Sequence, residues 1–220
     1  MIAKNMSVYG NIKSSSLNVQ LASQCAPVIF GVKVSNILIT RPENEMEVYR
    51  LFDGTDLAAK CIQKTETKAF FLLYHKQRLH QHLMQKSVLA FLKETGYEDL
   101  HTNELLNHFS QRFKTYNSKQ EFPHEIGIFL GYPIEDVIAF IEHKGKNYLL
   151  SGYWKVYGNP ETAKRTFRIY DQVKQLAVSI AARGVPMEQI LKINFNKIRR
   201  NDISWTKFMW FTGAEQEIQK

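Results

Sequence analysis

The sequence has little cysteine and no long apolar run. Its 220 residues include only 2 cysteines, Cys25 and Cys61, so no disulfide framework is needed and a reducing environment is expected. No apolar stretch approaches the ~20 residues that cross a bilayer. Residues 1–11 also lack the apolar segment of a secretory signal. We therefore expect a cytoplasmic protein without a transmembrane segment.

Common catalytic and metal-binding motifs are also missing. The sequence contains no HExxH, CxxC, P-loop or GxGxxG, which removes support for zinc proteases, nucleotide hydrolases and dinucleotide-binding folds. Three histidines, His75, His80 and His82, lie close together in the chain. His80 and His82 are two residues apart, so they do not share a helix face. We interpret the cluster as a solvated basic face and predict no metal site.

Positive charge is present but dispersed. The formal net charge is +8, yet acidic residues are interleaved and no run of five like charges occurs. The sequence also lacks zinc-finger spacing and RNA-recognition signatures. Composition therefore allows contact with anions but argues against nucleic-acid binding.

The hydrophobic pattern predicts an α+β fold. With 44% hydrophobic residues the chain can bury a core, and its helical and extended segments do not alternate strictly. Helices are expected near residues 17–25, 45–52, 76–92, 103–116, 133–143, 161–183 and 186–200. Strands are expected within 28–40 (a pair or one bent strand), 57–63 and 68–75, and at 148–150 and 153–157 (two strands or one strand bent at Ser151-Gly152). We expect a small sheet packed by several helices in one core domain, residues 14–185. A flexible N-terminus (1–13) and a C-terminal helical extension (186–220) would flank it.

The most distinctive stretch is Phe122–Gly158, FPHEIGIFLGYPIEDVIAFIEHKGKNYLLSGYWKVYG. The nearly continuous apolar run at 126–132 favours a buried strand or a buried turn over a surface helix. His124 and Glu125 precede this run. Their side chains either bond to local backbone groups or act as a general base or metal ligand. Adjacent residues of an extended segment point to opposite faces, which argues against a direct histidine–glutamate dyad.

Two further residues carry candidate chemistry. Cys25 follows a predicted helix, whose negative end would disfavour a thiolate, although Pro27 could begin a new turn and reverse this effect. The alternatives are a buried structural cysteine and a reactive thiol, with Lys33 or His124 as its charged neighbour or base. Lys33 itself lies within an apolar segment, where it must extend to water or find a partner.

Aromatic and basic residues also gather in the second half of the distinctive stretch. Lys146, Tyr153, Trp154 and Lys155 would suit an anionic planar ligand or a nucleotide base. The alternative is a strand whose aromatic face is packed and whose lysines lie in water. We select these four residues together with Lys33 as candidate ligand-binding residues.

The motif FPHEIGIFLGYP followed by GYWKVYG resembles the bacterial family named domain of unknown function 3793. Gln24-Cys25-Ala26-Pro27 with Gly31 and Lys33 is similar to the His-Cys-Ala-Pro…Gly-x-Lys signature of that family. The resemblance spans roughly residues 15–175. It implies a small, soluble, single-domain protein and no established activity.

This sequence departs from the family pattern at three places. Gln24 stands where members often carry histidine, while Leu149–Ser151 and Val173 stand where many carry cysteine. If the family's cysteines form a metal or cluster site, this chain cannot form it in the same way.

Several functional hypotheses remain. The first is a small-ligand-binding or thiol-dependent enzyme-like domain, with Cys25, His124 and Glu125 as candidate catalytic residues. The second is a non-catalytic interaction module that contacts a protein partner or another copy through basic and aromatic residues of 186–220, or through 144–157. A third is metal or haem handling. The sequence does not identify a substrate, cofactor or partner.

Overall fold

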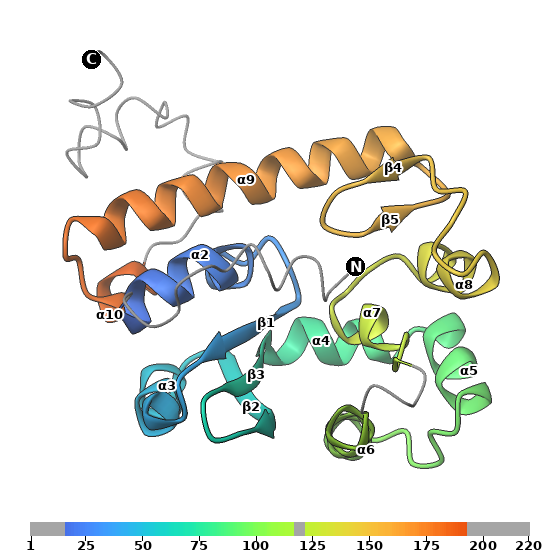
Figure 1. Ribbon diagram of the computed structural model, residues 1–220, viewed down its shortest axis with the longest axis horizontal. Helices are drawn as coiled ribbons and strands as arrows, with labels where there is room; N and C mark the ends of the chain where they lie inside the picture. Colours follow the sequence, from blue (N-terminus) through green and yellow to red (C-terminus); the bar gives the residue numbers. More distant parts are fainter. Residues whose placement is uncertain (1–15, 117–121, 193–220) are drawn as a thin grey trace.

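The computed structural model describes residues 16–116 and 122–192, and it shows an α+β fold (Figure 1). The predicted N-terminal segment and most of the predicted extension lie outside these residues. The elements are α2 (Leu17–Ile29), β1 (Ser35–Thr40), the 3-10 helix η1 (Pro42–Asn44), α3 (Glu45–Phe52), β2 (Leu57–Lys64), β3 (Ala69–His75), α4 (Lys76–Leu83), α5 (Lys86–Glu94), α6 (Thr102–Thr115), α7 (Ile126–Phe129), α8 (Ile134–Glu142), β4 (Leu150–Ser151), β5 (Lys155–Val156), α9 (Pro160–Ala182) and α10 (Met187–Ile190).

Three antiparallel strands form the main sheet, in the order β1-β3-β2. The predicted hairpin at 57–75 is confirmed, with a bulge between Cys61 and Gln63. Successive side chains of the central strand β3 point to opposite faces. Phe71 therefore enters one hydrophobic core, and Leu72 enters the other. Because both faces of the sheet are covered, β3 is apolar throughout its first five residues.

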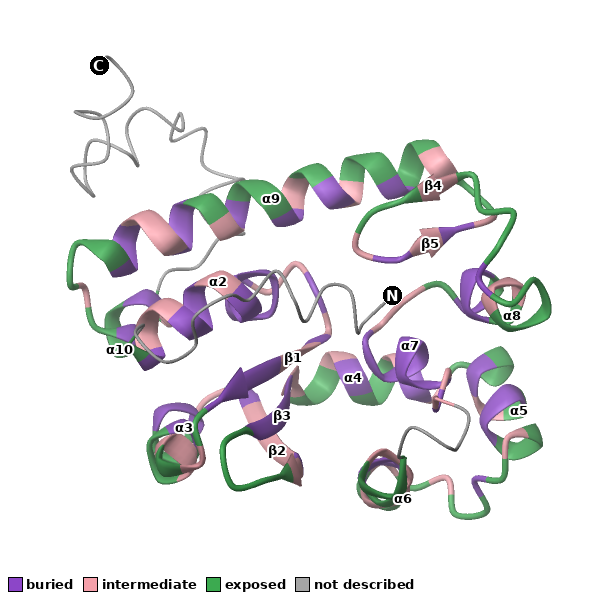
Figure 2. Ribbon diagram, in the orientation of Figure 1, coloured by how far each residue is buried: buried purple, intermediate pink, exposed green. Residues whose placement is uncertain are grey.

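The first core lies between the sheet and two long helices. Figure 1 shows α9 running along α2, which in turn covers one face of the sheet. Figure 2 shows that α2 is buried over most of its surface, whereas α9 buries only one stripe. The short helix α10 turns back, and its Met187 and Ile190 join this core. The described part of the predicted helix 186–200 is thus a single helical segment that packs against α2 and α9.

The expected end of the first helix is wrong. We predicted that Cys25-Ala26-Pro27 ends the helix and that strand structure begins at residue 28, but α2 continues to Ile29. Pro27 lies in the last turn of α2, where it cannot donate the helical hydrogen bond to the carbonyl of residue 23, so the helix ends with one bond fewer. The Pro27 carbonyl oxygen accepts hydrogen bonds from the backbone N–H groups of Val32 and Lys33, at 2.8 and 2.9 Å. These bonds turn the chain back toward β1.

The single helix predicted for residues 76–92 is also wrong, because the chain breaks at Met84 and Gln85 into α4 and α5. Leu79 and Val88 are nine residues apart, which places them on opposite sides of a continuous helix of about 3.6 residues per turn. Both are nevertheless fully buried in the second core. The break turns both side chains toward the same core.

Within the apolar run at 126–132, residues Ile126–Phe129 form the short buried helix α7 and a turn follows, so the buried-turn alternative holds and the strand alternative is wrong. Residues 126–130 are all buried, so the run carries no periodicity that separates a buried turn of helix from a strand. Gly131 ends the helix with φ of 72°. A β-carbon at this position would lie 2.2 Å from a methyl carbon of Val34, so both the backbone angle and the packing require glycine.

The remaining helix predictions near residues 45–52, 103–116, 133–143 and 161–183 are confirmed, as are two short strands, β4 and β5. Asn159 caps α9, as predicted, by accepting a hydrogen bond from the Thr162 N–H at 3.0 Å, and Pro160 is the first helical residue. Among the described helices, none is long and apolar enough to cross a membrane.

Replacing Asn159 with alanine should lower the free energy of unfolding by about 1 kcal/mol, because the first turn of α9 loses its side-chain acceptor. Urea denaturation measures this change. Gln172, exposed on the same helix, is the matched control, and its replacement by alanine should have little effect. Equal effects of both substitutions would contradict the cap assignment.

Candidate functional site

A cavity of about 360 Å³ lies where α2, β1, α6, α8 and the β4–β5 hairpin approach one another. Its walls are mainly apolar and include eight aromatic side chains. These are Phe70, Phe113, Tyr116, Phe122, Tyr132, Phe140, Tyr153 and Trp154. The basic groups in the walls are Lys33, His124, Lys155 and Lys174. An aromatic cavity with a few polar groups is typical of small-molecule sites.

Lys33 is the most deeply buried cation in the walls, with 4% of its surface exposed. Its ammonium donates a hydrogen bond to Asn36 Oδ1 at 2.6 Å and lies 5.2 Å from the centre of the Tyr132 ring. The Asn36 side-chain amide in turn donates to the backbone oxygen of Gln24. A fixed amide therefore positions Lys33 from the side of α2 and β1.

Burial lowers the pKa of Lys33 from 10.5 to about 7, and the nearby Cys25 opposes this shift only partly. Desolvation disfavours the charged ammonium, and only a close negative charge would restore it. Among the residues that the structure describes, no carboxylate forms an ion pair with Lys33. The cavity thus holds a buried amine that lacks a counter-ion from those residues.

Asp136, on α8, also lines the cavity, but its oxygens are occupied. Oδ2 accepts from Trp154 Nε1 at 2.7 Å. Oδ1 accepts from the backbone N–H groups of Tyr157 and Gly158, at 2.7 and 3.0 Å. Asp136 therefore fastens the β4–β5 hairpin to α8. The sequence suggested only a favourable charge at the start of α8, because its partners lie about twenty residues further along the chain.

The hairpin presents aromatic residues to the cavity. Trp154 stacks on Tyr132 with ring centres 5.2 Å apart and meets Phe167 edge-on. The Tyr132 hydroxyl donates to the backbone oxygen of Tyr153 at 3.1 Å. Lys155 donates to the backbone oxygen of Gly145, with its ammonium 4.6 Å from the Tyr148 ring centre. These contacts fix the aromatic wall opposite β1.

A family model matches residues 21–191, a span that includes all of these cavity residues. The chain belongs to the family described as protein of unknown function DUF3793. No curated protein and no solved structure matches it. The match includes α10 and so extends past residue 175, where the resemblance in the sequence ended. The division of the chain at residues 14 and 185 stays a prediction.

Of the predicted ligand-binding residues of this DUF3793 chain, Lys33, Tyr153, Trp154 and Lys155 all line the cavity. They come from segments about 120 residues apart. Lys146 is exposed in the turn after α8 and is not part of the walls. The aromatic–basic pattern therefore located one wall of the cavity, and the lysine within an apolar segment located another.

The three predicted catalytic residues do not converge. Cys25 is fully buried in the first core and does not line the cavity. Burial raises the pKa of its thiol to about 12, although Lys33 acts in the opposite direction. At neutral pH, Cys25 is therefore protonated and shielded from solvent, which is the opposite of what a reactive thiol requires.

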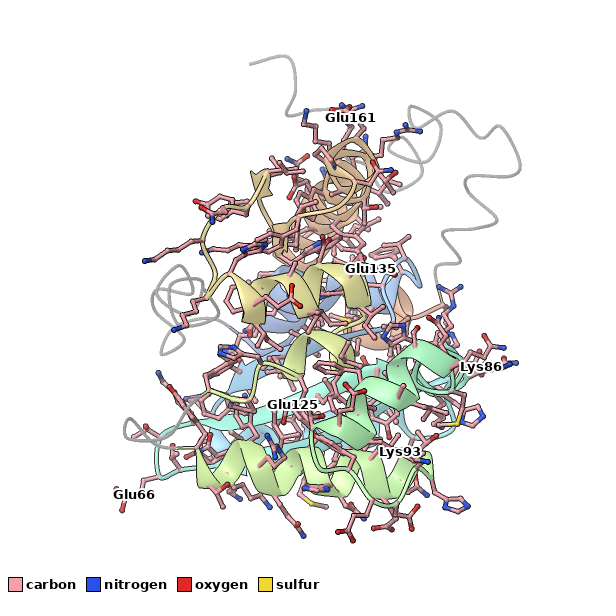
Figure 3. The ribbon with its side chains drawn as sticks, turned by 90° about the vertical axis from the view of Figure 1, so that its right-hand side faces the viewer. Glu66, Lys86, Lys93, Glu125, Glu135 and Glu161 are labelled. Atoms are coloured by element: carbon pink, nitrogen blue, oxygen red, sulfur yellow. The ribbon has the colours of Figure 1, made fainter. Side chains whose placement is uncertain are left out.

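His124 and Glu125 lie on different sides of their segment. His124 lines the cavity, with its ring centre 5.3 Å from that of Phe140. Glu125, labelled in Figure 3, lies among packed side chains. It accepts hydrogen bonds from Arg112 Nε at 2.5 Å and from the Tyr97 hydroxyl at 3.3 Å. This arrangement attaches α7 to α6, and it leaves His124 as the one residue of the pair at the cavity.

Gln24 also lines the cavity, and its amide has a structural role. The side chain accepts from the Ile39 N–H at 2.8 Å and donates to the Ile39 carbonyl at 3.0 Å. The Gln24 side chain therefore satisfies both the backbone N–H and the backbone C=O of Ile39, on the outer edge of β1. Within the described ranges, 16–116 and 122–192, no three histidine, cysteine or acidic side chains are grouped as a metal site requires.

Proposed function

We propose that this DUF3793 chain binds a planar, largely apolar small molecule whose anionic group pairs with Lys33. The observation that supports this proposal most strongly is the buried Lys33 ammonium, which faces an aromatic cavity and has no ion-pair partner among the described carboxylates. A ligand carboxylate placed there would act as its counter-ion.

The energetics favour a charged ligand group at this point. A buried ammonium without a counter-ion carries a desolvation cost, which is why the pKa of Lys33 falls. A carboxylate in contact would stabilise the protonated amine, and Asn36 already satisfies one of its donors. Binding would thus offset the desolvation cost that the Lys33 ammonium carries in the free protein.

The residues that line the cavity indicate the size and shape of the rest of the ligand. The cavity volume of about 360 Å³ falls within the range of about 300–1,000 Å³ that is usual for small-molecule sites. Tyr132, Phe140 and Trp154 offer ring faces and edges, which suit a flat aromatic or conjugated molecule. Tyr116, which also lines the cavity, is 36% exposed.

The ligand-binding form of our first hypothesis is better supported than its thiol-dependent form, because Cys25 is away from the cavity and buried. We further propose a bacterial, cytoplasmic protein. Support for this comes from the family resemblance and from two cysteines that are both free in the structure.

The test is equilibrium binding of 2-naphthoate, measured by calorimetry at pH 6.5. Wild-type protein should bind 2-naphthoate more tightly than uncharged naphthalene. Replacing Lys33 with methionine should weaken 2-naphthoate binding by at least about tenfold, or ~1.4 kcal/mol, and leave naphthalene binding nearly unchanged.

The matched control is the same substitution at Lys146, which is exposed and outside the walls. It should retain the wild-type affinity. Equal affinity of wild-type protein and the Lys33→Met variant for 2-naphthoate would refute the proposal.

A further inference from the structure

We infer that Lys33 is a nucleophile that forms an imine with an aldehyde or ketone ligand in the cavity. This inference rests on the proposed ligand site and names the class of compound it takes. It starts from the surroundings of one amine: a lysine 4% exposed, in the wall of an aromatic cavity, held by a neutral amide and unpaired with any carboxylate that the structure describes.

The contacts of Lys33 orient the amine without neutralising it. Asn36 Oδ1 accepts one N–H, and the Asn36 side-chain amide is itself anchored on Gln24, so the amine has a fixed position. The Tyr132 ring lies 5.2 Å away, close enough for its face to stabilise a cation. Its hydroxyl is occupied by Tyr153, so this tyrosine contributes its ring and not an acid.

Burial also prepares the amine for attack. With a pKa of about 7, roughly half of the Lys33 side chain is neutral at pH 7. An ordinary exposed lysine is neutral in about one molecule per 10³ at that pH. Desolvation in an apolar pocket is an established way to activate a lysine for imine chemistry.

The reaction balances without any oxidant or reductant. The Nζ lone pair attacks the carbonyl carbon, and the π electrons of the C=O bond move to oxygen. One proton leaves the nitrogen and one joins the oxygen, which gives a carbinolamine. The nitrogen then gives up its remaining proton, the hydroxyl group leaves with that proton as water, and the nitrogen lone pair forms the C=N bond. The net change is amine plus carbonyl to imine plus water. The apolar walls favour release of this water, and so favour the imine.

The other lysines in the walls are less suited to this reaction. Lys155 donates to the Gly145 carbonyl and lies over the Tyr148 ring. Lys174 is on α9 and is only partly buried. Both line the cavity and therefore serve as internal controls.

The experiment treats the full-length protein at pH 7 with 2-naphthaldehyde and cyanoborohydride, which reduces an imine to a stable secondary amine. Intact mass spectrometry counts the adducts, and peptide mapping locates them. We expect the adduct on Lys33 to form on the order of 10²–10³-fold faster than adducts at exposed lysines because of the difference in neutral fraction, and peptide mapping separates it from any adduct on the α-amino group. The Lys33→Met and Lys33→Arg variants should lose this adduct, while Lys146→Met, at an exposed residue outside the walls, keeps it. Circular dichroism verifies that each variant is folded.

Parallel binding of 2-naphthoate separates the two proposals. If 2-naphthoate binds but labelling is spread over exposed lysines, the imine inference is wrong and the ligand site stands. If neither probe engages the cavity, both proposals fail. Rapid labelling of Lys33 without 2-naphthoate binding would support the imine inference and overturn the anionic ligand.

Discussion

Replacing Lys33 with methionine should raise the free energy of unfolding by about 5 kcal/mol at pH 6 and by about 2 kcal/mol at pH 9. The unfolded chain binds a proton at Lys33 up to pH 10.5, whereas the folded chain releases it near pH 7. Protonation therefore favours the unfolded state. This cost is complete below pH 7 and disappears as the pH rises toward 10.5. Methionine fills a similar volume and carries no such cost.

Urea denaturation of both proteins at pH 6 and pH 9 measures this effect. Other groups also change stability with pH, because burial lowers the pKa of His75 and His82 and raises that of Cys25. Taking the difference between variant and wild type largely cancels their contributions. Lys146→Met, on the surface, should show no such pH-dependent gain.

A Lys33→Met variant that is less stable than wild type at pH 6 would contradict the buried-amine assignment. A gain in stability together with loss of 2-naphthoate binding is the expected signature of a residue retained for function.

Replacing Asp136 with alanine should lower the free energy of unfolding by about 3–5 kcal/mol. The substitution leaves the Trp154 indole N–H and the backbone N–H groups of Tyr157 and Gly158 without their acceptor. Each buried, unsatisfied donor costs about 1–3 kcal/mol, and partial access of water to the hairpin reduces the sum. The hairpin should also detach from α8, which would be seen as a red shift of Trp154 fluorescence in a background where Trp205 and Trp210 are replaced by phenylalanine.

Asp136→Asn is the graded control. Its amide oxygen can still accept from the two backbone N–H groups, but its NH₂ group would face the indole N–H of Trp154, so a smaller loss of about 1–2 kcal/mol is expected. Glu135→Ala, exposed on the same helix, should have little effect. If all three substitutions cost the same, the hairpin is not held by Asp136.

Sequence patterns predicted the fold where local signals are strong. Asn159-Pro160 marks the start of α9, and its long apolar stripe predicts a helix packed on one side. The β2–β3 hairpin likewise has alternating and β-branched or aromatic residues on either side of a polar turn. In both elements, local propensity and tertiary packing favour the same structure.

Predictions failed where tertiary packing decides the local structure. The run at 126–130 is buried all round, so its composition cannot separate a helical turn from a strand. The break at Met84 has no proline or glycine to mark it, and it follows from the need to turn Leu79 and Val88 toward one core. Pro27 indicated a helix end but lies inside α2, in its final turn.

The candidate site could be predicted only in part, for a related reason. A lysine in an apolar segment and a basic aromatic strand can each be recognised in the sequence, but their meeting in one cavity depends on the whole fold. Asp136 resembles any acidic residue at the start of a helix until its hairpin partners are known. Cys25 was the most conspicuous nucleophile, and its position in the centre of the first core separates it from the cavity.

The Gln24 side chain also affects whether the outer edge of β1 can pair with a strand from another copy of this chain. An outer strand normally presents free backbone groups on which another molecule can build, and that process leads to aggregation. At Ile39 both outward groups are already satisfied by Gln24, which imitates a neighbouring strand for one residue. An incoming strand would have to expel this buried amide before it could pair there, so the β1 edge is protected from growth without a charged or proline residue at that position.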